Sequence, residues 1–129
     1  MEIFGGKPRL DQAEAVVWQQ LANRTQSAGR AVGGRLFLTS TRLLFEPNRV
    51  DAATGGENWS APLTDIKSVG KQPRDGNPLS GGLRDRLRLT LPDGSAELFV
   101  VNRLEKVIGV VQDAVGQARP SSLPGQSDW

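Results

Sequence analysis

Residues 33–47 read GGRLFLTSTRLLFEP, and this stretch decides the fold. Large apolar side chains stand at every second position on both sides of a hydroxyl-rich segment at 39–41. A period of two is typical of half-buried strands, and hydroxyl side chains favour a turn because they bond to nearby backbone groups. The two leading glycines, Gly33 and Gly34, favour a close backbone approach that a side chain would obstruct. The stretch therefore predicts a β-hairpin, whose core residues are Leu36, Leu38, Leu43 and Phe45.

The composition excludes several classes of protein and site. The 129 residues suit one domain, and 37% hydrophobic and 23% charged residues are ordinary for a globular chain. The sequence has no cysteine and no histidine, which excludes disulfides, thiolate metal sites and histidine-dependent catalysis. The carboxylates are scattered among predicted turns, and no phosphate-binding glycine motif occurs. We expect no catalytic residues, no metal and no cofactor, and therefore a protein that is not an enzyme.

Alternation continues in the second half of the chain. Arg84–Leu91 carries leucines on one face and arginines on the other. Asp93 and Gly94 follow, and this dipeptide between alternating strands predicts a tight hairpin turn. The stretches 50–56 and 70–82 are rich in turn residues and predict loops, the second of them long and exposed. Further short strands are predicted at 57–63, 66–69 and 95–101.

A helix is predicted near the end of the chain. From Leu104 onward, apolar residues recur at helical spacing and form one stripe. Asn102, with Glu105 three residues on, resembles a capping box, and Gly116 is the expected stop. Periodicity leaves residues 10–25 open between a helix and a strand.

The hairpin resembles the core of a known family. Gly34–Thr39 (GRLFLT), followed by Arg42–Phe45 (RLLF), is similar to the motif G-x-L-[FY]-[LV]-T-x-x-R-L-x-F of GRAM domains of the bacterial type. These domains belong to the pleckstrin-homology-like (PH-like) superfamily. The resemblance implies a mainly β fold, a PH-like barrel of about seven antiparallel strands in two roughly orthogonal sheets, capped by one C-terminal amphipathic helix. Weaker similarities follow the family's order at 13–16, 59–66, 93–94 and Phe99.

The resemblance also divides the chain. It spans nearly all of the sequence apart from its end, and it implies that Ala15–Asn23 is the first strand. The last residues, RPSSLPGQSDW, carry two prolines and no apolar pattern, which is typical of an extended, unstructured segment. We therefore expect an N-terminal arm at 1–9, a PH-like (GRAM) domain at 10–118 and a disordered C-terminal tail at 119–129.

The net charge of +2 is unevenly distributed. Six basic and two acidic residues lie between Lys67 and Arg88, and such a cluster is usually a solvated face. A second interpretation is anion binding, because the arginine guanidinium can donate two parallel hydrogen bonds to a phosphate or carboxylate group. A third is cross-strand pairing of Arg86 and Arg88 with a residue such as Glu97. The candidate residues for binding an anionic headgroup or an acidic partner are Lys67, Lys71, Arg74, Arg84, Arg86 and Arg88, with Arg24 and Arg30 in the predicted first hairpin loop at 24–30.

The resemblance implies a non-catalytic binding or adaptor module. We expect it to bind a protein through an edge strand, the loop at 70–82 or the tail. The alternative is peripheral binding of anionic phospholipid headgroups, common in this superfamily, through the basic residues named above. Each cation near a membrane contributes only about 1 kcal/mol, so three or four give weak, salt-sensitive attachment. Nucleic acid is not an expected partner, because the basic stripe lacks interleaved aromatic side chains.

The apolar runs of the chain bear on its location. The N-terminal residues include Glu2 and lack the apolar run of a signal peptide. The other apolar runs are far shorter than the roughly 20 residues that cross a bilayer. We expect a cytoplasmic protein, peripheral to the membrane if the lipid alternative holds, and a monomer or weak homodimer.

Overall fold

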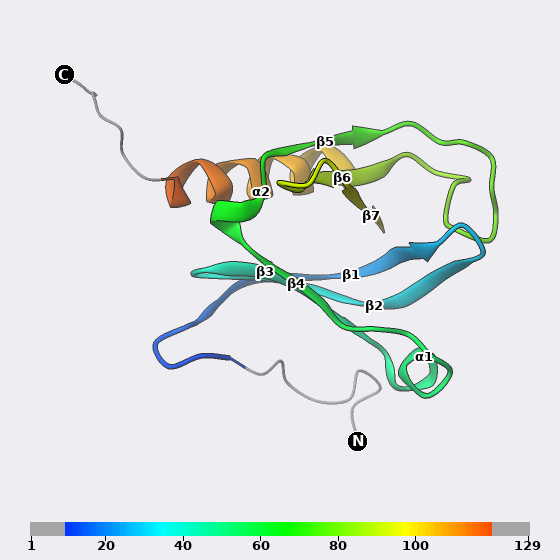
Figure 1. Ribbon diagram of the computed structural model, residues 1–129, viewed down its shortest axis with the longest axis horizontal. Helices are drawn as coiled ribbons and strands as arrows, with labels where there is room; N and C mark the ends of the chain where they lie inside the picture. Colours follow the sequence, from blue (N-terminus) through cyan, green and yellow to red (C-terminus); the bar gives the residue numbers. More distant parts are fainter. Residues whose placement is uncertain (1–9, 120–129) are drawn as a thin grey trace.

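The computed structural model describes residues 10–119, and seven strands and a C-terminal helix make up most of this range. Figure 1 shows two layers, with β1–β4 in one and β5–β7 in the other, and α2 beside the second. The elements in chain order are β1 (Val16–Ser27), β2 (Arg30–Thr39), β3 (Arg42–Pro47), α1 (Arg49–Ala53), β4 (Trp59–Pro62), the 3₁₀ helix η1 (Leu63–Asp65), β5 (Ser68–Gln72), β6 (Arg86–Thr90), β7 (Ala96–Val101) and α2 (Leu104–Ala118).

All seven strands belong to one antiparallel sheet, in the order β4-β3-β2-β1-β7-β6-β5. β1 joins the two layers, because it pairs with β2 along its length and with β7 only at Ala22–Arg24. The predicted barrel is therefore an open, bent sheet, since β4 and β5 are its edges and do not pair with each other. The prediction of a mainly β fold with seven antiparallel strands and one C-terminal helix is confirmed.

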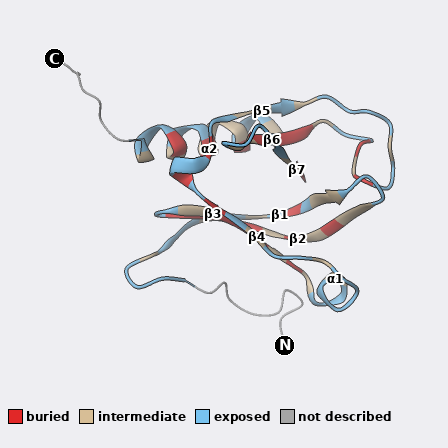
Figure 2. Ribbon diagram, viewed as in Figure 1, coloured by how far each residue is buried: buried red, intermediate tan, exposed pale blue. Residues whose placement is uncertain are grey.

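The hairpin of residues 33–47 has the predicted form. Its four predicted core residues are at most 3% exposed and belong to the core cluster, which lies between the two layers (Figure 2). A Cβ on Gly34 would collide with the carbonyl oxygen of Glu46 on the paired strand. The glycine is therefore required where β2 and β3 approach each other closely.

The C-terminal helix closes one end of the core. Val107, Val111 and Val115 are its buried residues, and they pack into the same cluster as the strands. The predicted cap is wrong: the helix begins after Arg103, which has a left-handed φ of 55° and makes no side-chain capping bond. The predicted stop is also wrong, because the helix continues through Gly116 to Ala118 and Ala118 still packs against the core.

Several other predicted boundaries differ from the observed ones. The predicted loop at 24–30 is mostly strand, because β1 and β2 remain paired as far as Ser27 and Arg30. The predicted loop at 50–56 contains α1, whose first turn is capped by Asn48 accepting from the Asp51 N–H at 2.8 Å. The strand expected at 66–69 is observed at 68–72. The predicted arm at 1–9 and residues 120–129 of the predicted tail lie outside the described residues.

Candidate binding surfaces

Arg86 is the most deeply buried of the eight predicted ligand-binding residues. It is 1% exposed, because the connection between β5 and β6 folds over the outer face of β6. Its Nη1 donates to Thr25 Oγ1 at 3.1 Å and to the Ser80 carbonyl at 3.4 Å, and its Nη2 lies 3.1 Å from Asp75 Oδ2. The Asn77 N–H and the Arg86 guanidinium hold the pKa of Asp75 below its usual range. Arg86 thus fastens this connection to the sheet and presents no free charge to a ligand.

Arg24 and Glu97 form an ion pair at the open end of the core. Arg24 Nε lies 2.8 Å from Glu97 Oε1, and the two side chains are 11% and 17% exposed. The predicted pairing of Glu97 with Arg86 or Arg88 is wrong. Glu97 is the register partner of Leu89, so it points to the inner face, whereas the two arginines alternate with leucines and point outward.

Arg30, at the same end of the molecule, forms hydrogen bonds within the chain. It donates to the carbonyl and the hydroxyl of Thr54, and to the Asp51 carbonyl at 3.2 Å. These carbonyls belong to the C-terminal end of α1, where a cation is favourable. The first hairpin therefore closes onto the β3–β4 connection and leaves neither of its predicted basic residues free for an anionic headgroup.

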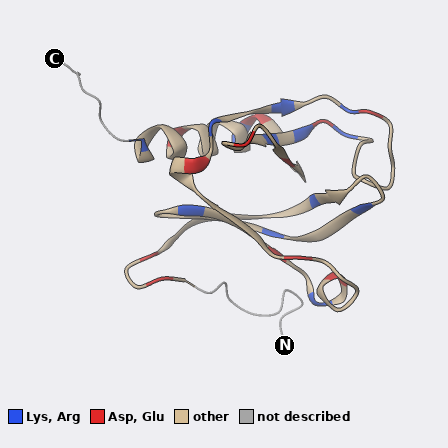
Figure 3. Cartoon of the chain, in the orientation of Figure 1, with Lys and Arg blue, Asp and Glu red and all other residues tan. Residues whose placement is uncertain are grey.

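The remaining basic residues lie on separate elements. Lys71 Nζ is 2.8 Å from Glu105 on α2, and this carboxylate raises the pKa of Lys71. Arg74 is 3.4 Å from Asp85. In the described part of the chain, Lys67, Arg84 and Arg88 form no ion pair. Figure 3 shows basic residues dispersed over both layers rather than gathered on one face.

A groove between β5 and α2 combines backbone groups at the edge of the sheet with an apolar floor. β5 is an edge strand, paired only with β6. The Val69 carbonyl accepts a hydrogen bond of 2.9 Å from Gln112 on α2, and the Lys67 carbonyl accepts one of 2.9 Å from Arg119. The Val69 carbonyl of β5 therefore points into the groove. Lys67 lies just before β5 and bonds on both sides, because its carbonyl accepts from Arg119 while its N–H donates to the Thr90 carbonyl on β6 at 2.7 Å. Its volume is about 300 Å³, and it is lined by Lys67, Ser68, Val69, Gln112, Val115, Gly116 and Arg119.

The floor and rim of this groove suit an extended chain. Val115 is 3% exposed and supplies apolar surface. A Cβ on Gly116 would meet nothing within 4 Å, so the wall of the helix is low at this position. Lys67 and Arg119 make the rim basic. The opposite edge of the sheet, β4, is shorter and ends at Pro62, and proline makes an edge a poor template for a further strand.

The sequence did not indicate Gln112 and Arg119. Gln112 is a polar residue on the solvent side of an amphipathic helix, where polar residues are the rule, and Arg119 follows the end of that helix in what the sequence predicted to be the tail. Only the packing of α2 beside the edge of β5 gives them a role. Among residues 10–119, no cluster of carboxylates suited to a metal ion occurs, and no helix is long and apolar enough to span a membrane.

The fold is similar to that of PH domains. No family model and no curated protein matches the sequence. Among solved structures, the Vps36 N-terminal PH domain matches with a TM-score of 0.60 and 20% identity, over 87% of this chain and 86% of that one. The hSac2 domain of human phosphoinositide phosphatase Sac2 matches with a TM-score of 0.59 and 16% identity, over 89% and 77%. The C-terminal domain of an unknown protein from Leishmania infantum matches with a TM-score of 0.61 and 11% identity, over 79% and 84%.

Proposed function

We propose that this PH-like domain is a non-catalytic adaptor module that binds an extended segment of a protein along the free edge of β5. The observation that carries the proposal is the pair of edge carbonyls, Lys67 and Val69, which open into a groove beside α2. An added strand gains affinity from main-chain hydrogen bonds and specificity from pockets for its side chains. The motif at 34–45 supports placing the domain in the GRAM branch of the superfamily.

The dispersal of the basic residues favours this role over headgroup binding. Five of the eight predicted binding residues are held by carboxylates of the same chain, namely Arg24, Arg30, Lys71, Arg74 and Arg86. A phosphate group would have to displace these partners one by one. A strand at β5 needs to displace only two side-chain donors, those of Gln112 and Arg119, and it replaces them with backbone N–H groups of its own.

The charge at the groove indicates the chemistry of the partner. Lys67 and Arg119 flank the edge, and Lys71 lies further along the same strand. Acidic side chains at alternate positions of an extended segment would face these cations. We therefore expect the bound segment to combine one apolar residue, for the floor at Val115, with acidic residues on either side.

Selection from a library of random peptides tests the proposal. Selected peptides are titrated into the ¹⁵N-labelled protein, and the expected result is a set of shifts confined to β5 and the facing side of α2. Residues two apart on a strand direct their backbone groups to the same side, so the Lys71 N–H points outward with the groups of Val69. Lys71→Pro removes this outward donor and leaves the hydrogen bonds between β5 and β6 in place. Edge strands tolerate proline at such a position.

Lys71→Gln is the matched control, because it removes the charge and the ion pair with Glu105 but keeps the N–H. Lys71→Pro is expected to weaken peptide binding at least tenfold relative to Lys71→Gln. Equal affinities of the two variants would contradict strand addition. Co-sedimentation with phosphatidylserine vesicles tests the lipid alternative. Pelleting at moderate salt that Arg88→Glu abolishes would favour a lipid surface over the proposed partner.

A further inference from the structure

The outer face of the β1–β4 layer carries an apolar pair that the core does not explain. Phe37 and Leu44 are register partners on β2 and β3. Their strand neighbours, such as Leu36 and Leu43, are fully buried in the core. Because successive side chains of a strand point to opposite faces, Phe37 and Leu44 point away from it. Both are nevertheless only 5% exposed, and neither belongs to the core cluster.

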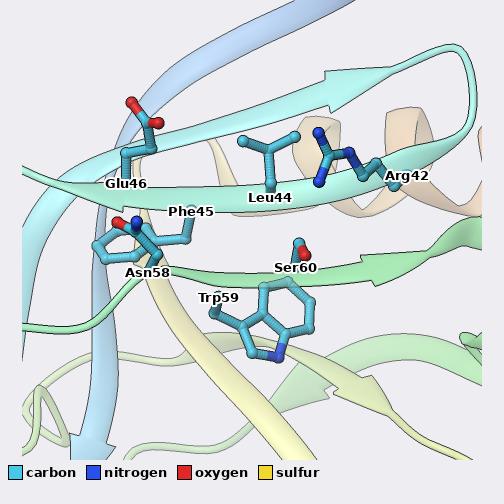
Figure 4. Close-up of a pocket in the computed structure, with 7 residues that line it drawn as sticks. All are labelled: Arg42, Leu44, Phe45, Glu46, Asn58, Trp59 and Ser60. Atoms are coloured by element: carbon cyan, nitrogen blue, oxygen red, sulfur yellow. The ribbon is translucent and has the colours of Figure 1, made fainter. Parts of the chain in front are cut away.

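Polar side chains flank Leu44 of this pair. Figure 4 shows Leu44 on the same side of β3 as Arg42 and Glu46, with Phe45 on the opposite side. These residues, with Asn58, Trp59 and Ser60, line a hollow of about 250 Å³. Burial raises the pKa of the Glu46 carboxyl, so this part of the rim is partly withdrawn from water. An apolar floor within a polar rim is typical of a surface on which another segment docks.

The described chain begins on this side of the sheet. Figure 1 shows the segment from residue 10 to residue 15 on the side of β1–β4 that faces away from α2. The Glu14 carboxylate accepts hydrogen bonds from Thr39 Oγ1 at 2.5 Å and Arg42 Nε at 2.8 Å. The Asp11 N–H donates to the same carboxylate at 2.9 Å. The chain at residue 11 is therefore held beside Arg42, two positions from Leu44 on the same face of β3.

Residues 1–9, MEIFGGKPR, have the length and the side chains to cover the pair. Nine extended residues span about 30 Å, whereas a layer of four strands is only about 15 Å wide. Ile3 and Phe4 are large apolar residues within this segment. A tethered segment also binds at a high effective concentration, so a small apolar contact is sufficient.

We propose that residues 1–9 dock in cis on the outer face of β1–β4, with Ile3 and Phe4 covering Phe37 and Leu44. This contact is distinct from the groove at β5, which lies at the other edge of the sheet beside α2. The outer face is then an interaction surface for an apolar extended segment, and this chain supplies its own.

Engineered disulfides test the contact, because the sequence has no cysteine. Ile3→Cys is combined with Ser60→Cys, at the exposed rim of the hollow, and neither change replaces Phe37 or Leu44. The control combines Ile3→Cys with Asp113→Cys, an exposed position on α2. Under mild oxidation of the full chain, the first pair is expected to form an intrachain disulfide at least tenfold faster than the control. Equal rates would overturn the proposal, and so would disulfide-linked dimers as the main product, because a second copy would then cover the face.

A second measurement does not depend on disulfide geometry. The double variant Ile3→Ser with Phe4→Ser is expected to bind the dye ANS several-fold more strongly than the parent chain, with an unchanged far-UV circular dichroism spectrum. Unchanged dye binding would overturn the proposal. Leu10→Ser, a change of an exposed leucine outside the docking segment, is the control and is expected to leave dye binding as it is.

Discussion

The side-chain amide of Gln112 on α2 donates a hydrogen bond of 2.9 Å to the carbonyl oxygen of Val69 on β5. This bond takes the place of one that an added strand would make. Arg119 does the same at Lys67, also at 2.9 Å. An uncovered edge strand is a template for aggregation, so the two side chains protect the edge while leaving it open to exchange with a competing backbone.

Gln112→Ala should separate two effects of this side chain, its stabilisation of the β5 edge and its competition with a bound peptide. The loss of one partly exposed hydrogen bond is expected to lower the free energy of unfolding by about 0.5–1.5 kcal/mol, measured by urea denaturation. Peptides selected for the β5 groove should bind this variant more tightly, because they no longer displace the amide. Gln117→Ala, an exposed change on another side of the same helix, should alter neither quantity. Weaker peptide binding by Gln112→Ala would contradict this role.

Gly34→Ala should destabilise the hairpin strongly. A Cβ at this position collides with the Glu46 carbonyl oxygen and lies too close to the Pro47 Cα, both of them backbone atoms that cannot move independently. The expected loss is about 3 kcal/mol or more, measured by chemical or thermal unfolding. Gly29→Ala is the control, because a Cβ there meets nothing within 4 Å, and its effect should stay within about 0.5 kcal/mol. Equal stability of the two variants would be inconsistent with the observed approach of β2 and β3.

Arg86→Met should loosen the β5–β6 connection. The variant loses the hydrogen bonds to Thr25, Ser80 and Asp75, each of which contributes about 1 kcal/mol. A fall of about 2–4 kcal/mol in the free energy of unfolding is expected, with faster proteolysis within residues 73–85. Arg88→Met, an exposed position on the same face of β6, should change stability by less than about 0.5 kcal/mol. If the two variants behaved alike, Arg86 would have no anchoring role.

Acid should weaken the domain through Glu14. The Arg42 guanidinium, with Thr39 and other donors, lowers the pKa of this carboxyl from 4.5 to about 2 against the opposing effect of burial. A lowered pKa in the folded state stabilises the fold above the unfolded value, and the contribution disappears as pH falls from about 5 to about 2. Glu14→Gln lacks this contribution, so the stability difference between parent and variant should shrink over that range. A difference that does not change with pH would contradict the ion pair.

The hairpin could be predicted from the sequence because its evidence is local. Alternation at 36–45 needs only the strand period to assign core and surface, and the burial of Leu36 and Phe45 follows. The same rule correctly placed Arg86 on the outer face of β6. It could not predict that Thr25 and Asp75, distant in sequence, would meet Arg86 there and remove it from water.

The ends of the C-terminal helix and the groove depend on tertiary contacts. Asn102 has the composition of a cap, but its side-chain oxygen accepts from Arg84 at 3.4 Å and its carbonyl accepts from Gln20 at 2.6 Å. Gly116 remains helical because Ala118, beyond it, still packs against the core. Gln112 cannot be distinguished from other polar helix residues until the edge of β5 is known to lie beside it.

Amide hydrogen exchange at β5 tests the central claim most directly. In the free protein, the outward N–H groups of Val69 and Lys71 lack a strand partner and should exchange rapidly. With a saturating selected peptide, both rates should fall at least tenfold, while the exposed amides of α1 should exchange as before. Binding of the peptide with no change at Val69 and Lys71 would contradict strand addition at this edge.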